Sequence, residues 1–476
     1  MVEIVALILL SFWTVFLIYD FKKAVIFLPV FFPLYLVKFQ VGFVPFNVIE
    51  VMVYLTGLFL FGKFVKKRIS GKVNWIEKLK KLGWGDGAIF KDVKARFFKL
   101  FLPAIVLALG SVAGLYLSHL FGSTIPALGI LKGWVLMPML YGWIVIRVLD
   151  DIEEKKATLY AYLVASLLLS LWGIYQAVTG DFITIDERAS GPFESANYLA
   201  LFIAPAFALS CVLIWQRLEE NFLEKYEEKS VIKRFFDKAK SLFVKIEIKD
   251  VLSPVFVFEL VCFVLIGMAL VASRSYGGIL GVVGALVIYA AYVIFLSVYR
   301  NGYGGLLKKI SIFVVIALIG VTAFWSQIGT SKMNDFLAFD RQSSSSVRVQ
   351  TWTITLKLIE ENPFLGLGLG RFQTVYEERG AELLGVEPYE ETMLHPHNLV
   401  LSTWANAGMA GVIALAWLIV AVFWSLKNKK LSIEERRFVA LILTMFLVVL
   451  LHGVVDQPLW KNDLALIWWM IICLVM

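Results

Sequence analysis

The sequence has little charge: only 17% of its 476 residues are Asp, Glu, Lys or Arg, whereas 59% are hydrophobic. A soluble chain of this length does not need so large an apolar fraction. Apolar runs of about 20 residues, each able to cross a hydrocarbon core, recur along the whole chain. The alternating ten-residue strands of an outer-membrane barrel are absent. The composition therefore predicts an all-α polytopic membrane protein.

Cysteine and histidine are also scarce. The three cysteines, Cys211, Cys262 and Cys473, all lie in apolar runs. They lack disulfide or zinc spacing and are interpreted as small buried hydrophobic residues. Two of the four histidines stand in one short motif, HPHN at 395–398. That concentration makes the motif a candidate functional site.

The apolar runs predict about twelve transmembrane helices. The first run has no basic segment before it and no small-residue cleavage site, so we interpret it as a retained helix rather than a signal peptide. The run 24–38 is short, contains Pro29 and Pro33, and is a candidate re-entrant segment. The expected ranges are 2–19, 24–38, 47–65, 98–121, 125–147, 157–178, 196–216, 252–273, 276–299, 310–328, 396–425, 436–453 and 462–476.

Basic residues fall on alternate connections between these runs, with twelve Lys and Arg in 63–99 and a further basic connection at 217–250. The positive-inside rule places these connections in the cytoplasm. The net charge of +8 is then a signature of topology, and no nucleic-acid partner is expected. The expected organisation is a membrane bundle over 1–328, a large periplasmic loop with short helices over 329–395, and C-terminal membrane helices over 396–476.

The opposite face carries few arginines, but they lie close to turns. They are Arg188, Arg274, Arg341, Arg348 and Arg371. A guanidinium near lipid is costly unless it is paired or lines a cavity, and Arg suits a phosphate or diphosphate. Each could alternatively extend to the interface or form a local ion pair. Several on one face favour an anion site.

Segment 346–360 has Trp352, Leu356 and Ile359 at helical spacing, and Asn362-Pro363 should end that helix. With Ser345 or Ser346 as its cap, Arg348 would lie in the first turn, where a helix favours anions. An interfacial helix that only packs on the bundle is the alternative. The glycines at 366, 368 and 370 are followed by no Gly-Lys-Ser/Thr, so a flexible turn is favoured over a phosphate loop.

Pro396 suits the first turn of the next helix, which would place His397 and Asn398 in that turn. A helix N-terminus disfavours imidazolium, and a neutral imidazole is what a general base requires. Asn398 could orient the ring or a substrate hydroxyl. Metal binding by the two histidines and a structural pair are the alternatives, and we expect no metal. Asp456 and Gln457 follow His452 on the same face, which makes Asp456 a secondary candidate.

Five stretches in this order resemble the O-antigen ligase and polymerase superfamily of integral membrane glycosyltransferases. They are RASGPFESANYLA (188–200), SRSYGG (273–278), SVRVQTW (346–352), NPFLGLGLGRF (362–372) and HPHNLVLSTWANAGMAGV (395–412). The run Ser343 to Ser346 is longer than the family pattern has between Arg341 and Arg348. The resemblance covers about the C-terminal two thirds of the chain.

The resemblance implies a GT-C-like enzyme that moves a glycan from undecaprenyl diphosphate without a metal or other cofactor. Arg188, Arg274 and Arg348 would bind the donor diphosphate, and His397 would take the proton of the acceptor hydroxyl. His395, Asn398, Arg341, Arg371 and Asp456 are secondary candidates. An O-antigen ligase that acts on lipid A–core at the periplasmic face of a bacterial inner membrane is the leading hypothesis. An O-antigen polymerase, a protein O-oligosaccharyltransferase and a non-enzymatic transporter of lipid-linked glycan stay as alternatives.

Overall fold

The structure is a computed structural model that describes residues 2–42, 44–69, 97–219, 253–301, 329, 333–334, 343–426 and 431–476. The chain divides into two compact units. Unit 1 comprises 1–165, 327–430 and 449–476, and unit 2 comprises 166–326 and 431–448. The predicted span 310–328, Arg341 and most of the two basic connections lie outside the described residues.

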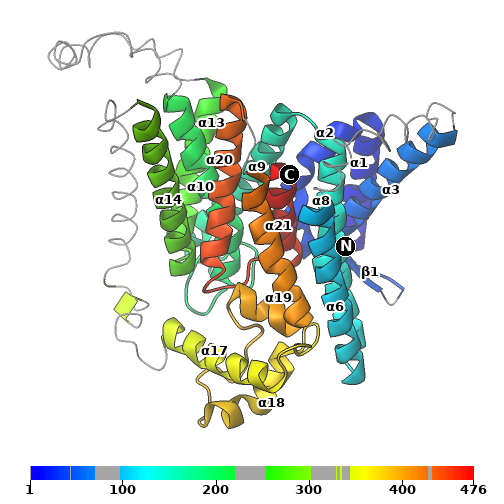
Figure 1. Cartoon of the computed structure of the whole chain (residues 1–476), viewed down its shortest axis with the longest axis vertical. Helices are drawn as coiled ribbons and strands as arrows, with labels where there is room; N and C mark the ends of the chain where they lie inside the picture. Colours follow the sequence, from blue (N-terminus) through cyan, green and yellow to red (C-terminus); the bar gives the residue numbers. More distant parts are fainter. Residues whose placement is uncertain are drawn as a thin grey trace. The chain divides into compact units, whose positions relative to one another are not determined.

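Nine helical stretches in the described part of the chain are long and apolar enough to cross a membrane. They confirm the prediction of an all-α polytopic membrane protein. Their ranges are Val2–Tyr19, Val48–Lys66, Phe98–Leu120, Thr124–Val148, Ile152–Thr179, Ala196–Leu218, Pro254–Ala272, Tyr276–Phe295 and Leu399–Leu426. In Figure 1 they correspond to α1, α3 (Val48–Ile69), α6 (Leu102–Leu120) with η2 (Phe97–Phe101), α7 (Thr124–Ile130) to α8 (Met137–Val148), α9, α10, α13, α14 (Tyr276–Asn301) and α19.

The candidate re-entrant segment forms short elements. Helix α2 (Phe21–Phe27) continues into the 3-10 helix η1 (Leu28–Leu36). Asp20 caps α2 by accepting a hydrogen bond from the Lys23 amide. Neither element has the roughly 20 residues that a membrane crossing requires. A two-stranded hairpin of β1 (Lys38–Val41) and β2 (Val44–Asn47), which the sequence had not predicted, follows and leads into α3.

The core of unit 1 is built on two helix pairs. Helix α6 packs along α19, and α21 (Asn462–Val475) packs against α8 (Figure 1). Small residues allow the first pair to approach closely, because a Cβ at Gly114 would lie 2.1 Å from the Asn406 carbonyl oxygen. Helix α21 has only 14 residues and 13 of them are buried, so it is a core helix of this unit.

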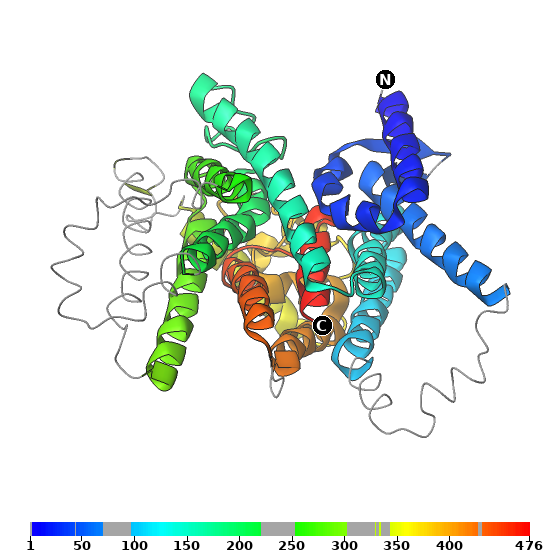
Figure 2. The same cartoon turned by 90° about the horizontal axis from the view of Figure 1, so that it is seen from above.

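In unit 2, α10 packs against both α13 and α14 (Figure 2). Most of α20 (Ile433–His452) belongs to the same unit, and the Gln216 amide of α10 donates to the Arg437 carbonyl there. Arg217 also pairs through two bonds of 2.8 Å with Glu259 of α13, whose side chain is fully buried. Such pairing satisfies a carboxylate that would otherwise be costly in apolar surroundings.

The long helix α19 is broken at Gly408, where φ is 62° and ψ is −162°. The glycine-rich segment 363–370 lies in this break. The amides of Leu367 and Gly368 donate to the Ala405 carbonyl, and the Met409 amide donates to the Phe364 carbonyl. A buried backbone group needs a hydrogen-bond partner. The segment and the break in α19 therefore supply each other's backbone hydrogen bonds.

Two further amides of this segment are also bonded within unit 1. Leu369 donates to the Gly114 carbonyl of α6, and Gly370 donates to the side-chain oxygen of Asn406. The segment is therefore a turn, as predicted, but a closely packed one. Because the four successive amides from Leu367 to Gly370 already have protein partners, these positions lack the open donors with which a phosphate loop holds its ligand.

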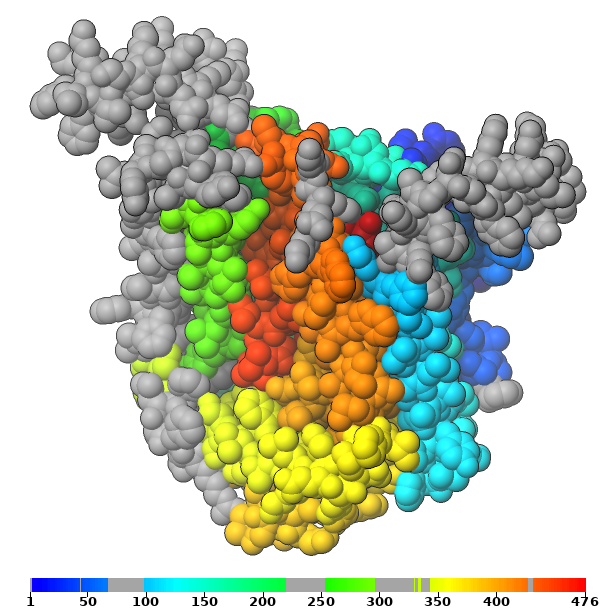
Figure 3. Space-filling model, viewed as in Figure 1, coloured from blue at the N-terminus to red at the C-terminus, as the bar shows by residue number. Residues whose placement is uncertain are grey.

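Helix α17 (Ser344–Glu361) and α18 (Phe372–Leu384) share a small core with the start of α19. Figure 3 shows the two helices covering the end of α19 in unit 1. The helix predicted over 346–360 is confirmed, and Asn362 ends it. The predicted cap is wrong: the Ser343 hydroxyl, rather than Ser345 or Ser346, accepts a hydrogen bond from the Ser346 amide. Arg348 consequently lies just beyond the first turn.

Candidate active site

The HPHN motif immediately precedes α19, which begins at Leu399. The side-chain oxygen of Asn398 accepts hydrogen bonds from the amides of Val400 and Leu401 and caps the helix. The prediction that Pro396, His397 and Asn398 form the first turn is therefore wrong by one to three residues. An Asn is a better cap than the residues before it, and this preference decides where the helix starts.

His397 has a left-handed backbone with φ of 49°. This region is strained for residues other than glycine, and such strain persists only where neighbouring contacts impose it. Here the following residues are tied to the loop after α20. Leu399 donates to the Gly453 carbonyl at 2.7 Å, and the Asn398 amide group donates to the Val454 carbonyl at 2.8 Å. These bonds fix the motif beside the loop that carries Asp456.

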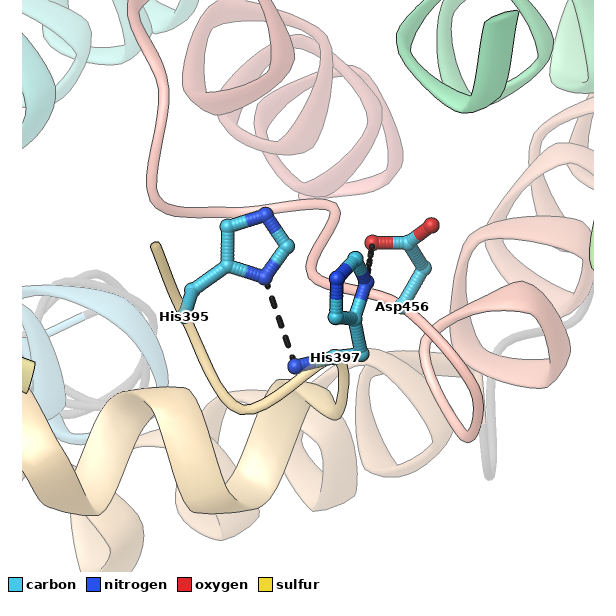
Figure 4. Close-up of side chains that lie close together, drawn as sticks. All are labelled: His395, His397 and Asp456. Carbon is cyan, nitrogen blue, oxygen red and sulfur yellow. Dashed lines mark hydrogen bonds and ion pairs between the residues drawn. The ribbon is translucent and has the colours of Figure 1, made fainter. Parts of the chain in front are cut away.

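Figure 4 shows the imidazole of His397 between His395 and Asp456. Its Nδ1 lies 3.2 Å from Oδ1 of Asp456, a residue 59 positions later in the chain. The two imidazole rings have centroids 4.2 Å apart, and Nδ1 of His395 accepts a hydrogen bond from the His397 backbone amide. The sequence placed the histidines together but did not pair either of them with the carboxylate.

The charges of this cluster are set by burial and by proximity. Burial disfavours an ionised Asp456, but the neighbouring imidazole of His397 outweighs it and holds the pKa of Asp456 below its ordinary value. Burial, reinforced by His397, lowers the pKa of His395 to about 3, so that ring is neutral. An ionised Asp456 accepts the proton on Nδ1 of His397. In the neutral form of this imidazole the lone pair is then on Nε2.

Helix α17 supports both segments of the cluster. Nε of Arg348 donates to the Val455 carbonyl at 2.8 Å, directly before Asp456. The indole of Trp352, one turn further along, donates to the Pro396 carbonyl at 2.9 Å, directly before His397. The structure therefore brings Arg348, His397 and Asp456 into one site within unit 1.

Two buried polar atoms of this site have no hydrogen-bond partner. They are Oδ2 of Asp456 and Nδ1 of His452, whose residues are 1% and 2% exposed. An unpaired buried polar atom costs about 1–3 kcal/mol. One donor atom each from His395, His397 and Asp456 also lies within 4.8 Å of the others, a spacing that could hold a metal ion. Asp456 thus supplies a carboxylate ligand, which the sequence had not associated with the two histidines when metal binding was considered.

Arg188 and Arg274 lie together in unit 2. Nε of Arg188 donates to the Ser273 carbonyl at 2.8 Å, next to Arg274. The same guanidinium bonds Asp186 at 3.0 Å and the side-chain oxygen of Asn197 at 2.8 Å. Arg274 has a left-handed backbone with φ of 47°. Arg188 thus stabilises the strained turn at Arg274, a structural role that the sequence had not predicted.

Arg371 lies at the end of the glycine-rich segment in unit 1. Its guanidinium lies 3.7 Å from the ring centroid of Phe121, and its Nη1 donates to the Leu367 carbonyl. Burial lowers the pKa of Arg371 from its ordinary value. The contact with Phe121 is a cation–π interaction that joins this segment to the end of α6. These two contacts therefore give Arg371 a packing role.

Comparison with known proteins shows that part of the chain is similar to a known family. Residues 261–416 match the O-antigen ligase family. The resemblance seen in the sequence motifs is thereby confirmed. A protein of Rickettsia conorii, provisionally named a polysaccharide ligase, is 27% identical over 131 residues. This similarity covers 27% of the present chain and 29% of that relative, so the chain matches less than a third of the relative's length.

Proposed function

We propose that the protein is a ligase-type glycosyltransferase in which His397 is the general base and Asp456 orients it. The hydrogen bond between Nδ1 of His397 and Oδ1 of Asp456 carries this proposal. A carboxylate on Nδ1 leaves the lone pair on Nε2, and that nitrogen accepts the proton of an acceptor hydroxyl. The match to the O-antigen ligase family supports a glycan as the group transferred.

In the proposed step, the acceptor oxygen attacks the anomeric carbon of a lipid-linked glycan. A new C–O bond forms as the bond from that carbon to the diphosphate oxygen breaks, and the bond's electrons leave with the diphosphate. The acceptor proton passes to Nε2 of His397. Attack opposite the leaving group inverts the anomeric configuration. The diphosphate develops charge as it leaves, and a guanidinium can stabilise that charge in place of a metal ion.

Arg348 is the proposed diphosphate ligand of unit 1, because its contact with Val455 places it one residue from Asp456. The resemblance assigns the same role to Arg188 and Arg274 of unit 2, and each is to be tested by its own substitution. The secondary assignments of His395 and Asn398 also remain proposals. By their contacts, they support the His397 backbone and cap α19, respectively.

The length of α19 supports an outward-facing site. After the break at Gly408, the part of this helix over 409–426 covers 18 residues, about 27 Å at 1.5 Å per residue, within the range of a membrane-crossing helix. HPHN precedes it, whereas Lys427, Lys429 and Lys430 follow it. The positive-inside rule assigns the basic end to the cytoplasm and HPHN to the opposite side. We therefore propose a periplasmic O-antigen ligase of a bacterial inner membrane, with undecaprenyl-diphosphate-linked glycan as donor.

The acceptor is tested with purified protein in lipid nanodiscs and a polyprenyl diphosphate glycan as donor. Parallel reactions contain lipid A–core, a second glycan repeat or a pilin-like protein. We expect product only with lipid A–core. Product only with the glycan repeat or the protein would replace the ligase by the polymerase or the protein O-oligosaccharyltransferase. Donor consumption in none of the reactions would contradict a glycosyltransferase.

A further inference from the structure

We propose that His395, His397 and Asp456 form a binding site for a zinc ion and that zinc bound there inhibits the transfer reaction. The inhibition by zinc rests on the proposed role of His397 as the base, whereas the binding of zinc is independent of that role. Imidazole nitrogens and one carboxylate oxygen are the donors of many zinc sites with an open position. Magnesium, in contrast, prefers oxygen donors.

The distances suit this ion. Zn–N and Zn–O bonds of about 2.0–2.2 Å in a tetrahedron set neighbouring donor atoms roughly 3.4 Å apart. Nδ1 of His397 and Oδ1 of Asp456 are already 3.2 Å apart. One donor atom of His395 lies within 4.8 Å of both, so a modest side-chain rotation closes the site.

A second observation points to a cation at this position. Oδ2 of Asp456 is buried and has no hydrogen-bond partner. A divalent ion on the cluster would compensate this uncovered carboxylate oxygen, as bound ions do for buried acidic groups. The backbone around the ligands is already fixed by Trp352 and Asn398. The ion therefore does not need to order the loops that carry its ligands.

Zinc at this site would remove the base by fixing the wrong tautomer. When Nδ1 of His397 coordinates zinc, the proton that Nδ1 carried is released to solvent, and the neutral ring takes up its single N–H proton on Nε2 instead. Nε2 then has no lone pair for the acceptor proton. The Asp456 carboxylate is also withdrawn from the imidazole, because it binds the same ion. Zinc would therefore act as an inhibitor of a reaction that does not use a metal.

Binding is measured first, without any substrate, by calorimetric titration of metal-free protein with zinc chloride. We expect one zinc per chain for the wild type and more than about tenfold weaker binding for His395→Ala and Asp456→Asn. His119→Ala is the matched control, because this exposed histidine instead contacts Thr124. Magnesium chloride at the same concentration should give no heat of binding. Absence of zinc binding, equal binding in His395→Ala, or competition by magnesium would overturn the site.

Two further measurements separate the binding site from the proposed function. Cobalt substitution of the wild type should give the visible absorption of a tetrahedral ion, a readout that requires no variant. In the transfer assay, added zinc should inhibit the wild type, and an excess of chelator should restore its rate. A protein that transfers glycan at full rate with zinc bound would overturn the inhibition by zinc. Zinc binding by a protein that transfers nothing would leave the site intact and contradict the proposed function alone.

Discussion

The glycine-rich segment 363–370 and the HPHN motif are both loop motifs of unit 1, but they use their polar groups differently. In the glycine-rich segment, the amides of Leu367 to Gly370 donate hydrogen bonds to α6 and to α19 near its break. The backbone around HPHN is also fixed, yet its site retains an unpaired buried oxygen on Asp456 and a strained residue at His397. Unpaired polar groups on a backbone that is otherwise held in place are typical of a site that acts on a ligand.

This difference predicts separate consequences of substitution. Changes at His397 and Asp456 should reduce the transfer rate while the fold persists, because Trp352, Asn398 and Leu399 hold the surrounding backbone in place. Changes in the glycine-rich segment should reduce stability, because Gly366 and Gly368 allow two backbones to approach and Gly370 leaves room for the Ile130 side chain.

His397→Ala should produce the largest loss of activity. Removal of a general base lowers the rate by about 10²–10⁴-fold. The transfer rate at saturating donor and acceptor is the measurement, and the thermal midpoint should stay close to that of the wild type. His119→Ala provides a matched loss of an imidazole elsewhere in unit 1. A wild-type rate in folded His397→Ala would remove this residue from the mechanism.

Asp456→Asn should lower the same rate by about 10²-fold, near the lower end of the range for a general base. The amide can donate a hydrogen bond to Nδ1 of His397, which favours the tautomer with its proton on Nε2. The base then holds its lone pair on the wrong nitrogen. Nitrogen NMR of labelled histidine would report the tautomer directly. An unchanged tautomer together with an unchanged rate would show that Asp456 does not orient the ring.

Gly366→Ala should destabilise the protein by about 3 kcal/mol, with activity lost only as the protein unfolds. Gly366 has φ of +74°, and an added Cβ would lie 2.3 Å from the Trp404 carbonyl oxygen. The matched control is Gly385→Ala, with φ of +82° and no atom within 4 Å of the added Cβ. The control should cost about 1 kcal/mol from backbone strain alone. Equal thermal shifts in the two variants would contradict the close packing of the segment.

Arg348→Lys should raise the KM for the donor by about tenfold. Lys keeps the charge but cannot reproduce the guanidinium, which donates from Nε to the Val455 carbonyl and from Nη1 to the Ser344 carbonyl. Arg379→Lys is the control, because this arginine of α18 pairs with Glu361 and Glu382 instead. An unchanged KM for the donor in Arg348→Lys would argue against a diphosphate contact.

A chelator should have the smallest effect. We expect EDTA to leave the transfer rate of purified protein unchanged, or to raise it where contaminating zinc is removed. No proposed step requires a metal ion, since arginine stabilises the leaving diphosphate. The measurement is the initial rate before and after dialysis against EDTA. Complete loss of activity that added metal restores would make the cluster of His395, His397 and Asp456 catalytic as a metal site.

The sequence predicted the helices well because their apolar runs are a local signal. The span expected over 196–216 is α10 over Ala196–Leu218, and the helix expected over 346–360 is α17. The limits of these elements differ by a few residues, chiefly where a capping side chain decides them. Ser343 and Asn398 are two such cases. Local periodicity does not reveal which of several nearby polar residues becomes the cap.

The tertiary features of the site were beyond such local reasoning. His397 and Asp456 were separate candidates, but they lie 59 positions apart, and their pairing depends on how the intervening chain folds back. Similarly, the Gly366, Gly368 and Gly370 spacing showed a loop without showing the break in α19 that receives it. In both cases the deciding contact joins two segments that have no common pattern in the sequence.

The central claim is that His397 and Asp456 act as one unit, and a double-mutant cycle tests it most directly. The transfer rates of His397→Ala, Asp456→Asn and the double variant are compared at saturating substrates. When Asp456 acts only through His397, the double variant is as slow as His397→Ala within a few-fold. Losses that instead multiply, so that the double variant is slower by a further factor of about 10², would contradict the paired base.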